Sequence, residues 1–166
     1  MKNLTYMVWL MAVTVISLTS CSKDSIEDLD SADLTTAVTP VSYSDLELDV
    51  LDLVNAYRVQ QGLSELQPVN EGSIQAANHN DHMISNNEVC HDYFGARYQA
   101  LVQSVRAEAV SENVGYGYHT ADAVVNAWIN SPGHRENMLG NFTHFGVSVK
   151  EGKDGKFYFT NIFVRK

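Results

Sequence analysis

Cysteine is scarce in this chain of 166 residues, which contains two, Cys21 and Cys90. Basic residues are also few: 11 lysines and arginines stand against 20 aspartates and glutamates, which gives a formal net charge of −9. Nucleic acids and anionic membranes attract proteins that carry an excess of positive charge. The charge balance therefore argues against a nucleic-acid partner and against attachment to an anionic membrane by charge.

Two catalytic signatures are missing from the sequence, the Gly-x-Ser-x-Gly of serine hydrolases and the His-Glu-x-x-His of zinc peptidases. The chain also has no internal repeat with a period of about 20 to 50 residues, the range typical of repeat proteins. Residues 45–166 suit one domain with a core of moderate size.

The N-terminal segment has the features of an export signal. Lys2 supplies a positive charge, and residues 4–18 form an uncharged, mostly apolar run. A membrane-spanning helix needs about 20 apolar residues, whereas the apolar part of a signal peptide has about 7 to 15. The run ends in LTSC at 18–21, which resembles the lipobox of bacterial lipoproteins. We therefore predict a signal peptide over 1–20 and acylation of Cys21.

An acylated Cys21 would anchor the protein to a lipid bilayer in the bacterial cell envelope. The alternatives are an uncleaved anchor helix, or an ordinary signal peptide followed by an incidental cysteine. Cleavage after residue 20 removes Lys2 and no acid, so the formal charge changes from −9 to −10. With Cys21 acylated, Cys90 has no intrachain disulfide partner and is expected to be a free thiol.

Residues 21–44 are predicted to be a lipidated, flexible tether. From residue 22 this segment holds five acids and one lysine, with many serines and threonines and few large apolar residues. Such a composition cannot bury enough apolar surface to offset the loss of conformational entropy on folding. Its acidic start also resembles signals that send some lipoproteins to the cell surface.

Folded structure is predicted to begin at Asp45. Ser44 and Glu47 form a capping box, apolar residues then recur at helical spacing, and Gly62 is a natural stop. The sequence predicts helices over about 45–61, 71–86 and 93–105, and a further one that is capped by Thr120 and ends at Ser131-Pro132-Gly133. In the second of these helices Ile74, Ala77 and Ile84 are expected to face the core.

The C-terminal stretch changes from helical to strand periodicity. Residues 145–150 and 156–164 are rich in aromatic and β-branched residues, and the glycine-containing segment 151–155 lies between them as a turn. Residues 112–118 could add another strand. Helices followed by strands predict an α+β fold, with the helices packed on a small antiparallel sheet.

Several segments resemble, in their order and spacing, the CAP superfamily (cysteine-rich secretory, antigen 5 and pathogenesis-related 1 proteins) in its small bacterial form. The most specific segment is WINSPGHRENML at 128–139, which is similar to the family's W-M-N-S-P-G-H-R-x-N-I-L. Weaker matches are NAYR at 55–58, AANHNDHM at 76–83 and FTHFGV at 142–147. The resemblance covers about residues 50 to 164 and implies an α-β-α sandwich.

The resemblance also implies a cleft lined by two histidines and one or two glutamates. The matching positions are His91, Glu112 and His134, whereas the place of the second glutamate is taken by Ser131. Two imidazoles and a carboxylate could hold Zn²⁺ or another divalent cation with one position open for water. They could instead carry out acid–base chemistry, or be structural groups joined by hydrogen bonds.

Further positions around this cleft follow from the same resemblance. Asn113 and Asn137 match family positions and are expected to support the cleft by hydrogen bonds to loop backbone. Two residues depart from the family pattern: Ser111 replaces a glycine, and Cys90 stands where a small residue is usual. Cys90 beside His91 suggests a thiol nucleophile, but neighbours on a strand point to opposite faces, which disfavours it.

The remaining candidates are mostly interpreted as structural. His79 and His82 lie three apart on a predicted helix, so they could form a metal pair; the alternative is one helix-face histidine and one exposed histidine. Aromatic residues near the C-terminus are expected in the core: Trp128, Phe145, Phe157, Phe159 and Phe163.

These features predict a membrane-tethered, extracytoplasmic binding module, without enzymatic activity, that holds a lipid, a small molecule, a metal or a protein in its cleft. The alternative is a metal-dependent, peptidase-like hydrolase that uses His91, Glu112 and His134. A third hypothesis, envelope scaffolding, fits the anchor but requires no cleft.

Overall fold

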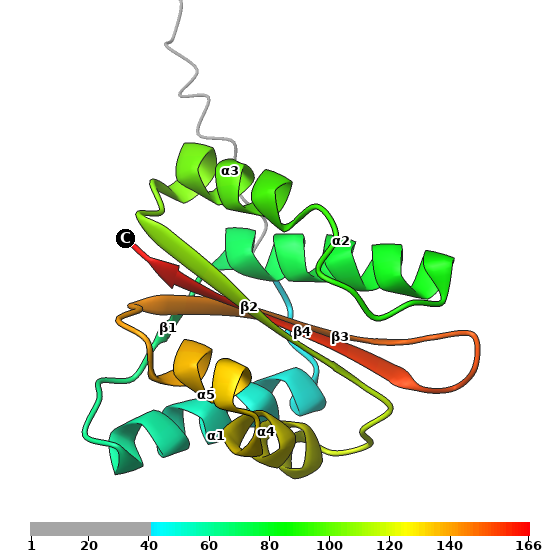
Figure 1. The fold of residues 1–166 in the computed structure, drawn as a ribbon, viewed down its shortest axis with the longest axis horizontal. Coiled ribbons are helices and arrows are strands. Elements are labelled where there is room, and N and C mark those ends of the chain that lie inside the picture. The colour runs from blue at the N-terminus through cyan, green and yellow to red at the C-terminus, as the bar shows by residue number, and fades with distance from the viewer. Residues whose placement is uncertain (1–40) are drawn as a thin grey trace, which may run out of the picture. The chain divides into compact units, whose positions relative to one another are not determined.

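The computed structural model describes residues 41–166 (Figure 1). The predicted signal peptide, the acylation of Cys21 and the tether up to residue 40 lie outside the described residues, so these remain predictions. Across residues 41–166, no helix combines the length and the apolar character needed to cross a bilayer.

A four-stranded sheet in the order β1-β3-β4-β2 forms the middle layer. The antiparallel strands β2 (Ala109–Tyr116), β3 (His144–Glu151) and β4 (Phe157–Arg165) make up most of it. The short strand β1 (Gln67–Pro68) was not predicted; it pairs parallel to β3, so the sheet predicted as antiparallel is mixed at this edge. An edge position suits Pro68, because proline has no N–H to donate to a second neighbour.

Helices cover both faces of the sheet (Figure 1). α2 (Asn70–Asn86) and α3 (Phe94–Val105) lie on one side. α1 (Asp45–Gln60), α4 (Ala121–Asn130) and α5 (Pro132–Leu139) lie on the other. The predicted α+β class and α-β-α layering are therefore confirmed. The predicted capping box is present, with the Ser44 side chain accepting from the Glu47 amide and the Glu47 side chain accepting from the Ser44 amide.

The helix α5 was not predicted, because Ser131-Pro132-Gly133 was interpreted as the end of a helix. Ser131 does end α4, but it is also the residue that precedes α5. Pro132 occupies the first turn of α5, where proline has the backbone angle of a helix and the missing N–H would have no partner within the helix.

The core of the described residues consists of one large apolar cluster and two smaller ones. Trp128, Phe145, Phe159 and Phe163 are fully buried between the sheet and α1 and α4, as predicted, and Phe157 packs against them while half-buried. A smaller cluster on the other face consists of Val69, Ala76, Leu101, Ala107, Ile162 and Val164, and a third consists of Met83, Val114 and Tyr158.

The prediction that Ile74 faces the core is wrong, since its side chain is 41% exposed. α2 instead buries one large apolar residue, Met83, together with small and polar residues: Gly72, Ser73, Ala76, His79 and Asn80. The glycine and serine at the start of this face let the helix backbone lie directly against Gly146 of β3. This close approach brings the polar side chains of α2 to the sheet.

Replacement of Gly146 by alanine should destabilise the fold by about 2–3 kcal/mol, because a methyl group there would overlap the backbone of Gly72 and Ser73. Urea denaturation at constant m-value measures the change. Gly133→Ala is the matched control, because it adds the same methyl group in open space on α5 and should be neutral or slightly stabilising. Equal stability of the two variants would contradict the close helix–sheet approach.

Candidate functional site

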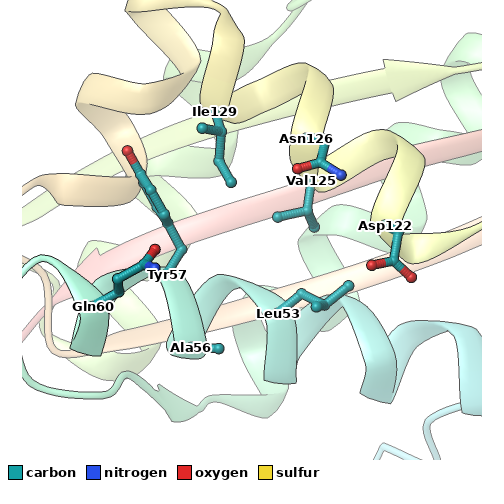
Figure 2. Close-up of a pocket in the computed structure, with 8 residues that line it drawn as sticks. All are labelled: Leu53, Ala56, Tyr57, Gln60, Asp122, Val125, Asn126 and Ile129. Carbon is teal, nitrogen blue, oxygen red and sulfur yellow. The ribbon is translucent and has the colours of Figure 1, made fainter.

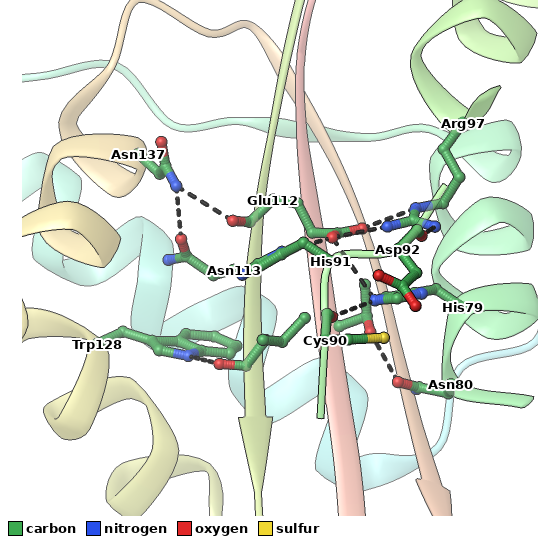
Figure 3. A network of polar contacts seen from close by, with 12 residues as sticks. His79, Asn80, Cys90, His91, Asp92, Arg97, Glu112, Asn113, Trp128 and Asn137 are labelled. Atoms are coloured by element: carbon green, nitrogen blue, oxygen red, sulfur yellow. Dashed lines mark hydrogen bonds and ion pairs between the residues drawn. The ribbon is translucent and has the colours of Figure 1, made fainter. Parts of the chain in front are cut away.

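The centre of the site is the Glu112 carboxylate on β2, whose side chain is 1% exposed. Arg97 donates two hydrogen bonds of 2.8 Å to this carboxylate, from Nε to Oε2 and from Nη2 to Oε1 (Figure 3). His91 Nδ1 donates a further 2.8 Å hydrogen bond to Oε1. Charge-assisted, two-point contacts of this kind are among the strongest polar interactions in proteins.

The surroundings keep Glu112 ionised. Burial by itself raises the pKa of this carboxyl group, but hydrogen bonds from His91 and Arg97, with the charge on Arg97, outweigh burial and lower the pKa below its usual value. At neutral pH, Glu112 is therefore a carboxylate with both oxygens engaged. It is a weak base and has no proton to give.

Buried groups from α2 and α3 hold the loop that carries His91. Arg97, in the first turn of α3, also donates from Nη1 to the Asp92 carbonyl at 2.6 Å. His79 on α2 is 1% exposed and donates from Nε2 to the Cys90 carbonyl at 2.8 Å. Its Nε2 lies 3.6 Å from Glu112 Oε1, and burial lowers its pKa. The sequence did not point to Arg97, and it left His79 either in a metal pair with His82 or as a helix-face histidine.

The other side of Glu112 faces α5 through two asparagines. Asn137 Nδ2 donates to the Glu112 carbonyl at 3.1 Å and to Asn113 Oδ1 at 2.9 Å. Asn113 Nδ2 in turn donates to the carbonyl of His134 at 3.0 Å. These bonds, drawn in part in Figure 3, tie the strand that carries Glu112 to the helix that carries His134.

The trio predicted from the sequence is only partly brought together. His91 and Glu112 are in direct contact, whereas His134 lines a different hollow; burial, followed by the charge of His91, lowers the pKa of His134. In the described part of the chain, however, no group of possible metal donors includes all three residues.

A cation bound by Glu112 does not fit this arrangement. The Arg97 guanidinium occupies both carboxylate oxygens and would repel a second positive charge. His91 donates its Nδ1 proton to Glu112, so the ring nitrogen that His91 has left for a metal is Nε2. The predicted metal site at His91, Glu112 and His134 therefore gains no support from the geometry.

Two hollows flank the predicted residues. One of about 270 Å³ is lined by His91, Phe94, Val110, Ser111, Glu112 and Asn137. The other, of about 320 Å³, is lined by residues that include Trp128, Ser131 and His134. The His91 side chain is 52% exposed, and the buried Ser111 hydroxyl has no hydrogen-bond partner among the described residues. The first hollow therefore offers a ligand the exposed His91 imidazole beside apolar walls, with the unpartnered Ser111 hydroxyl buried in its lining.

A third hollow of about 260 Å³ lies between α1 and α4 (Figure 2). Its walls carry Leu53, Tyr57, Val125 and Ile129, together with polar side chains that include Asp122. It contains none of the site residues predicted from the sequence. We therefore place the candidate site at Glu112 and not between these helices.

Curated relatives cover most of this chain. It is 36% identical over 121 residues to the uncharacterized protein YkwD of Bacillus subtilis (strain 168), covering 70% of this chain and 47% of that protein. It is 34% identical over 123 residues to the uncharacterized membrane protein YlbC of the same strain, covering 72% and 34%. The chain thus spans less than half the length of each relative.

Solved structures share the fold. An outer surface protein from Borrelia burgdorferi superposes with a TM-score of 0.65 at 22% identity, covering 74% of this chain and 96% of that one. An extracellular protein containing an SCP domain from Bacillus anthracis str. Ames gives 0.63 at 26% identity, covering 77% and 45%. Residues 51–164 match the family described as the cysteine-rich secretory protein family, CAP. Because that match extends over more than half of the sequence, this chain belongs to the CAP family.

Proposed function

We propose that this protein is a lipid-anchored, extracytoplasmic binding module whose hollow beside Glu112 takes a small ligand with an apolar part and a hydrogen-bonding group. The observation that carries the proposal is the state of Glu112, which is buried, ionised and hydrogen-bonded at both oxygens by Arg97 and His91. Such a carboxylate stiffens a binding site, because both of its oxygens are already held by neighbouring side chains.

The residues that line the hollow favour a ligand with both apolar and polar parts. Phe94 and Val110 supply apolar surface, whereas His91 Nε2 and the Ser111 hydroxyl are polar groups with unused hydrogen-bonding capacity. A ligand that satisfied these two groups while covering Phe94 would be recognised by both shape and hydrogen bonding. A lipid acyl chain with its carboxylate has this chemistry.

The proposed location rests on the N-terminal sequence and on the relatives. The lipobox-like segment that ends at Cys21 supports an anchor. One relative is named a membrane protein, and the structural neighbours include an outer surface protein and an extracellular protein. The longer relatives could share an activity or a partner with this chain only if the shared domain is responsible for it.

Binding can be tested by titrating the detergent-purified chain with a fluorescent long-chain fatty acid, cis-parinaric acid. Saturable binding should weaken by about tenfold or more in Phe94→Ala and Ser111→Ala, since each removes one of the recognition features. Leu48→Ala is the control, because Leu48 is exposed on α1 and should leave binding unchanged. Equal binding by all four proteins would reject the hollow as the site for this ligand.

One observation favours the hydrolase alternative. The hydrogen bond from His91 Nδ1 to Glu112 fixes the tautomer in which Nε2 carries a lone pair, as in carboxylate–histidine pairs that act as bases. A hydrolase should cleave casein or a p-nitrophenyl ester, and His91→Ala should abolish cleavage. Turnover that persists in His91→Ala, or no turnover with or without added Zn²⁺, would leave the binding module as the function of the cleft.

A further inference from the structure

We propose that His82, Cys90 and Asp92 form a binding site for Zn²⁺ or a similar thiol-binding divalent transition metal. Among residues 41–166, these three are the one group of histidine, cysteine and acidic side chains whose donor atoms all lie within 4.8 Å of one another. The site shares no ligand with the Glu112 cleft and does not rest on the function proposed for that cleft.

The donor set suits zinc. An imidazole nitrogen, a thiolate sulfur and a carboxylate oxygen are the three ligand types that Zn²⁺ takes in proteins, usually in a tetrahedral arrangement. The thiolate disfavours Mg²⁺ and Ca²⁺, which prefer oxygen ligands. Three protein ligands leave a fourth position for water or for a ligand atom.

The distances are close to those of a bound ion. Two metal–ligand bonds of about 2.1 Å at the tetrahedral angle place their donor atoms about 3.4 Å apart. His82 Nε2 lies 3.7 Å from Asp92 Oδ2, which is too long for a good hydrogen bond between the two groups. Small rotations of the three side chains would therefore bring all the donors to one ion.

The buried network beside the site already fixes the loop that carries two of the ligands. The Cys90 carbonyl accepts from His79, and the Asp92 carbonyl accepts from Arg97 (Figure 3). The loop also turns through positive φ angles at Asn87 and Tyr93, of 52° and 58°. A ligand loop held by its own main chain loses little conformational freedom when metal binds, which favours affinity.

The third ligand is held from α2. The Tyr93 ring meets the His82 imidazole edge-on, with centroids 5.2 Å apart, and His79 stacks beside it at 6.1 Å. The Asn86 amide also faces the imidazole nitrogens, at 3.1 and 3.2 Å. Asn86 is exposed at the end of α2, so its side chain can turn away when Nε2 binds an ion.

The test uses the chain with Cys21→Ser, purified in detergent, so that Cys90 is its single thiol. Titration with Co²⁺ is followed by absorption, because a cobalt–thiolate bond gives a charge-transfer band in the near ultraviolet. One Co²⁺ per chain should bind and give this band, and Zn²⁺ should displace it. Proton release on binding, measured in weak buffer, is expected from deprotonation of the thiol.

Variants assign the ligands. Cys90→Ser should abolish the charge-transfer band, and His82→Ala and Asp92→Asn should each weaken binding by about tenfold or more. Asp92 is exposed, so its variant should fold normally and remains informative if the other two unfold. The control is His119→Ala, which removes an exposed histidine outside the cluster and should change nothing.

Three results would overturn the proposal. The first is the absence of a charge-transfer band at millimolar Co²⁺. The second is a band that survives both His82→Ala and Asp92→Asn, which would indicate a simple thiol adduct. The third is binding that His91→Ala abolishes and His82→Ala does not, which would place the metal in the Glu112 cleft. Fatty-acid binding there is measured separately, so either proposal can fail alone.

Discussion

Replacing Arg97 with methionine should lower the free energy of unfolding by about 3–5 kcal/mol, the usual cost of removing one partner of a buried ion pair. Methionine keeps most of the side-chain volume but leaves the Glu112 carboxylate buried without its main partner. Urea denaturation measures the change. The control is Arg165→Met, whose pairing with Glu108 at 3.1 Å is largely exposed and should be worth less than about 1 kcal/mol.

A double-mutant cycle shows whether the cost comes from the stranded charge. Glu112→Gln in the Arg97→Met background should recover part of the lost stability, because the uncompensated carboxylate is then absent.

The acid sensitivity of the fold gives a second check on the same ion pair. The pKa of Glu112 is lower in the folded state, so its stabilising contribution is present above the unfolded pKa and is lost as pH falls through the folded pKa. Arg97→Met and the double variant should both lose this part of the pH dependence of stability. Acid unfolding that is the same as in the wild type would contradict the pairing of Arg97 with Glu112.

Local sequence signals were enough to predict most helices and strands. The predicted helix over 45–61 is Asp45–Gln60, and that over 93–105 is Phe94–Val105, since caps and helical spacing are encoded in a few neighbouring residues. The strand Gln67–Pro68 was missed because two residues show no periodicity and pair through tertiary contact alone. The exposure of Ile74 has a similar cause: small residues, not apolar ones, let α2 approach the sheet.

The site was predictable to a smaller extent. Family resemblance supplied His91 and Glu112, which the structure places in contact. It did not supply Arg97, because a buried arginine has no periodic signature and sequence does not reveal which charged residues are buried. The cluster of His82, Cys90 and Asp92 was missed for another reason. Its geometry depends on how the loop between α2 and α3 folds back onto α2, and spacing along the chain does not define that path.

Replacing Arg58 with methionine should cost about 3 kcal/mol of unfolding free energy, since one buried and two partly buried carbonyls lose their donor at once. Arg58 lies near the end of α1 and is 3% exposed. Burial lowers the pKa of its guanidinium. Its guanidinium donates to the carbonyls of Ser64 at 3.0 Å, Met138 at 2.6 Å and Gly140 at 3.0 Å. It thereby joins α1 to the C-terminal end of α5.

Lysine at position 58 is the matched variant, because it keeps the charge but cannot direct donors at three carbonyls from one planar group. The stability of Arg58→Lys should lie between that of the wild type and that of Arg58→Met. Since α5 carries His134 and Asn137, hydrogen exchange should show faster opening of α5 in Arg58→Lys than of the sheet strands. If the amides of α5 and of the strands exchanged at equally raised rates, Arg58 would support the whole domain evenly. If only the amides of α5 exchanged faster, the Glu112 cleft would depend on an arginine that contacts the far end of that helix.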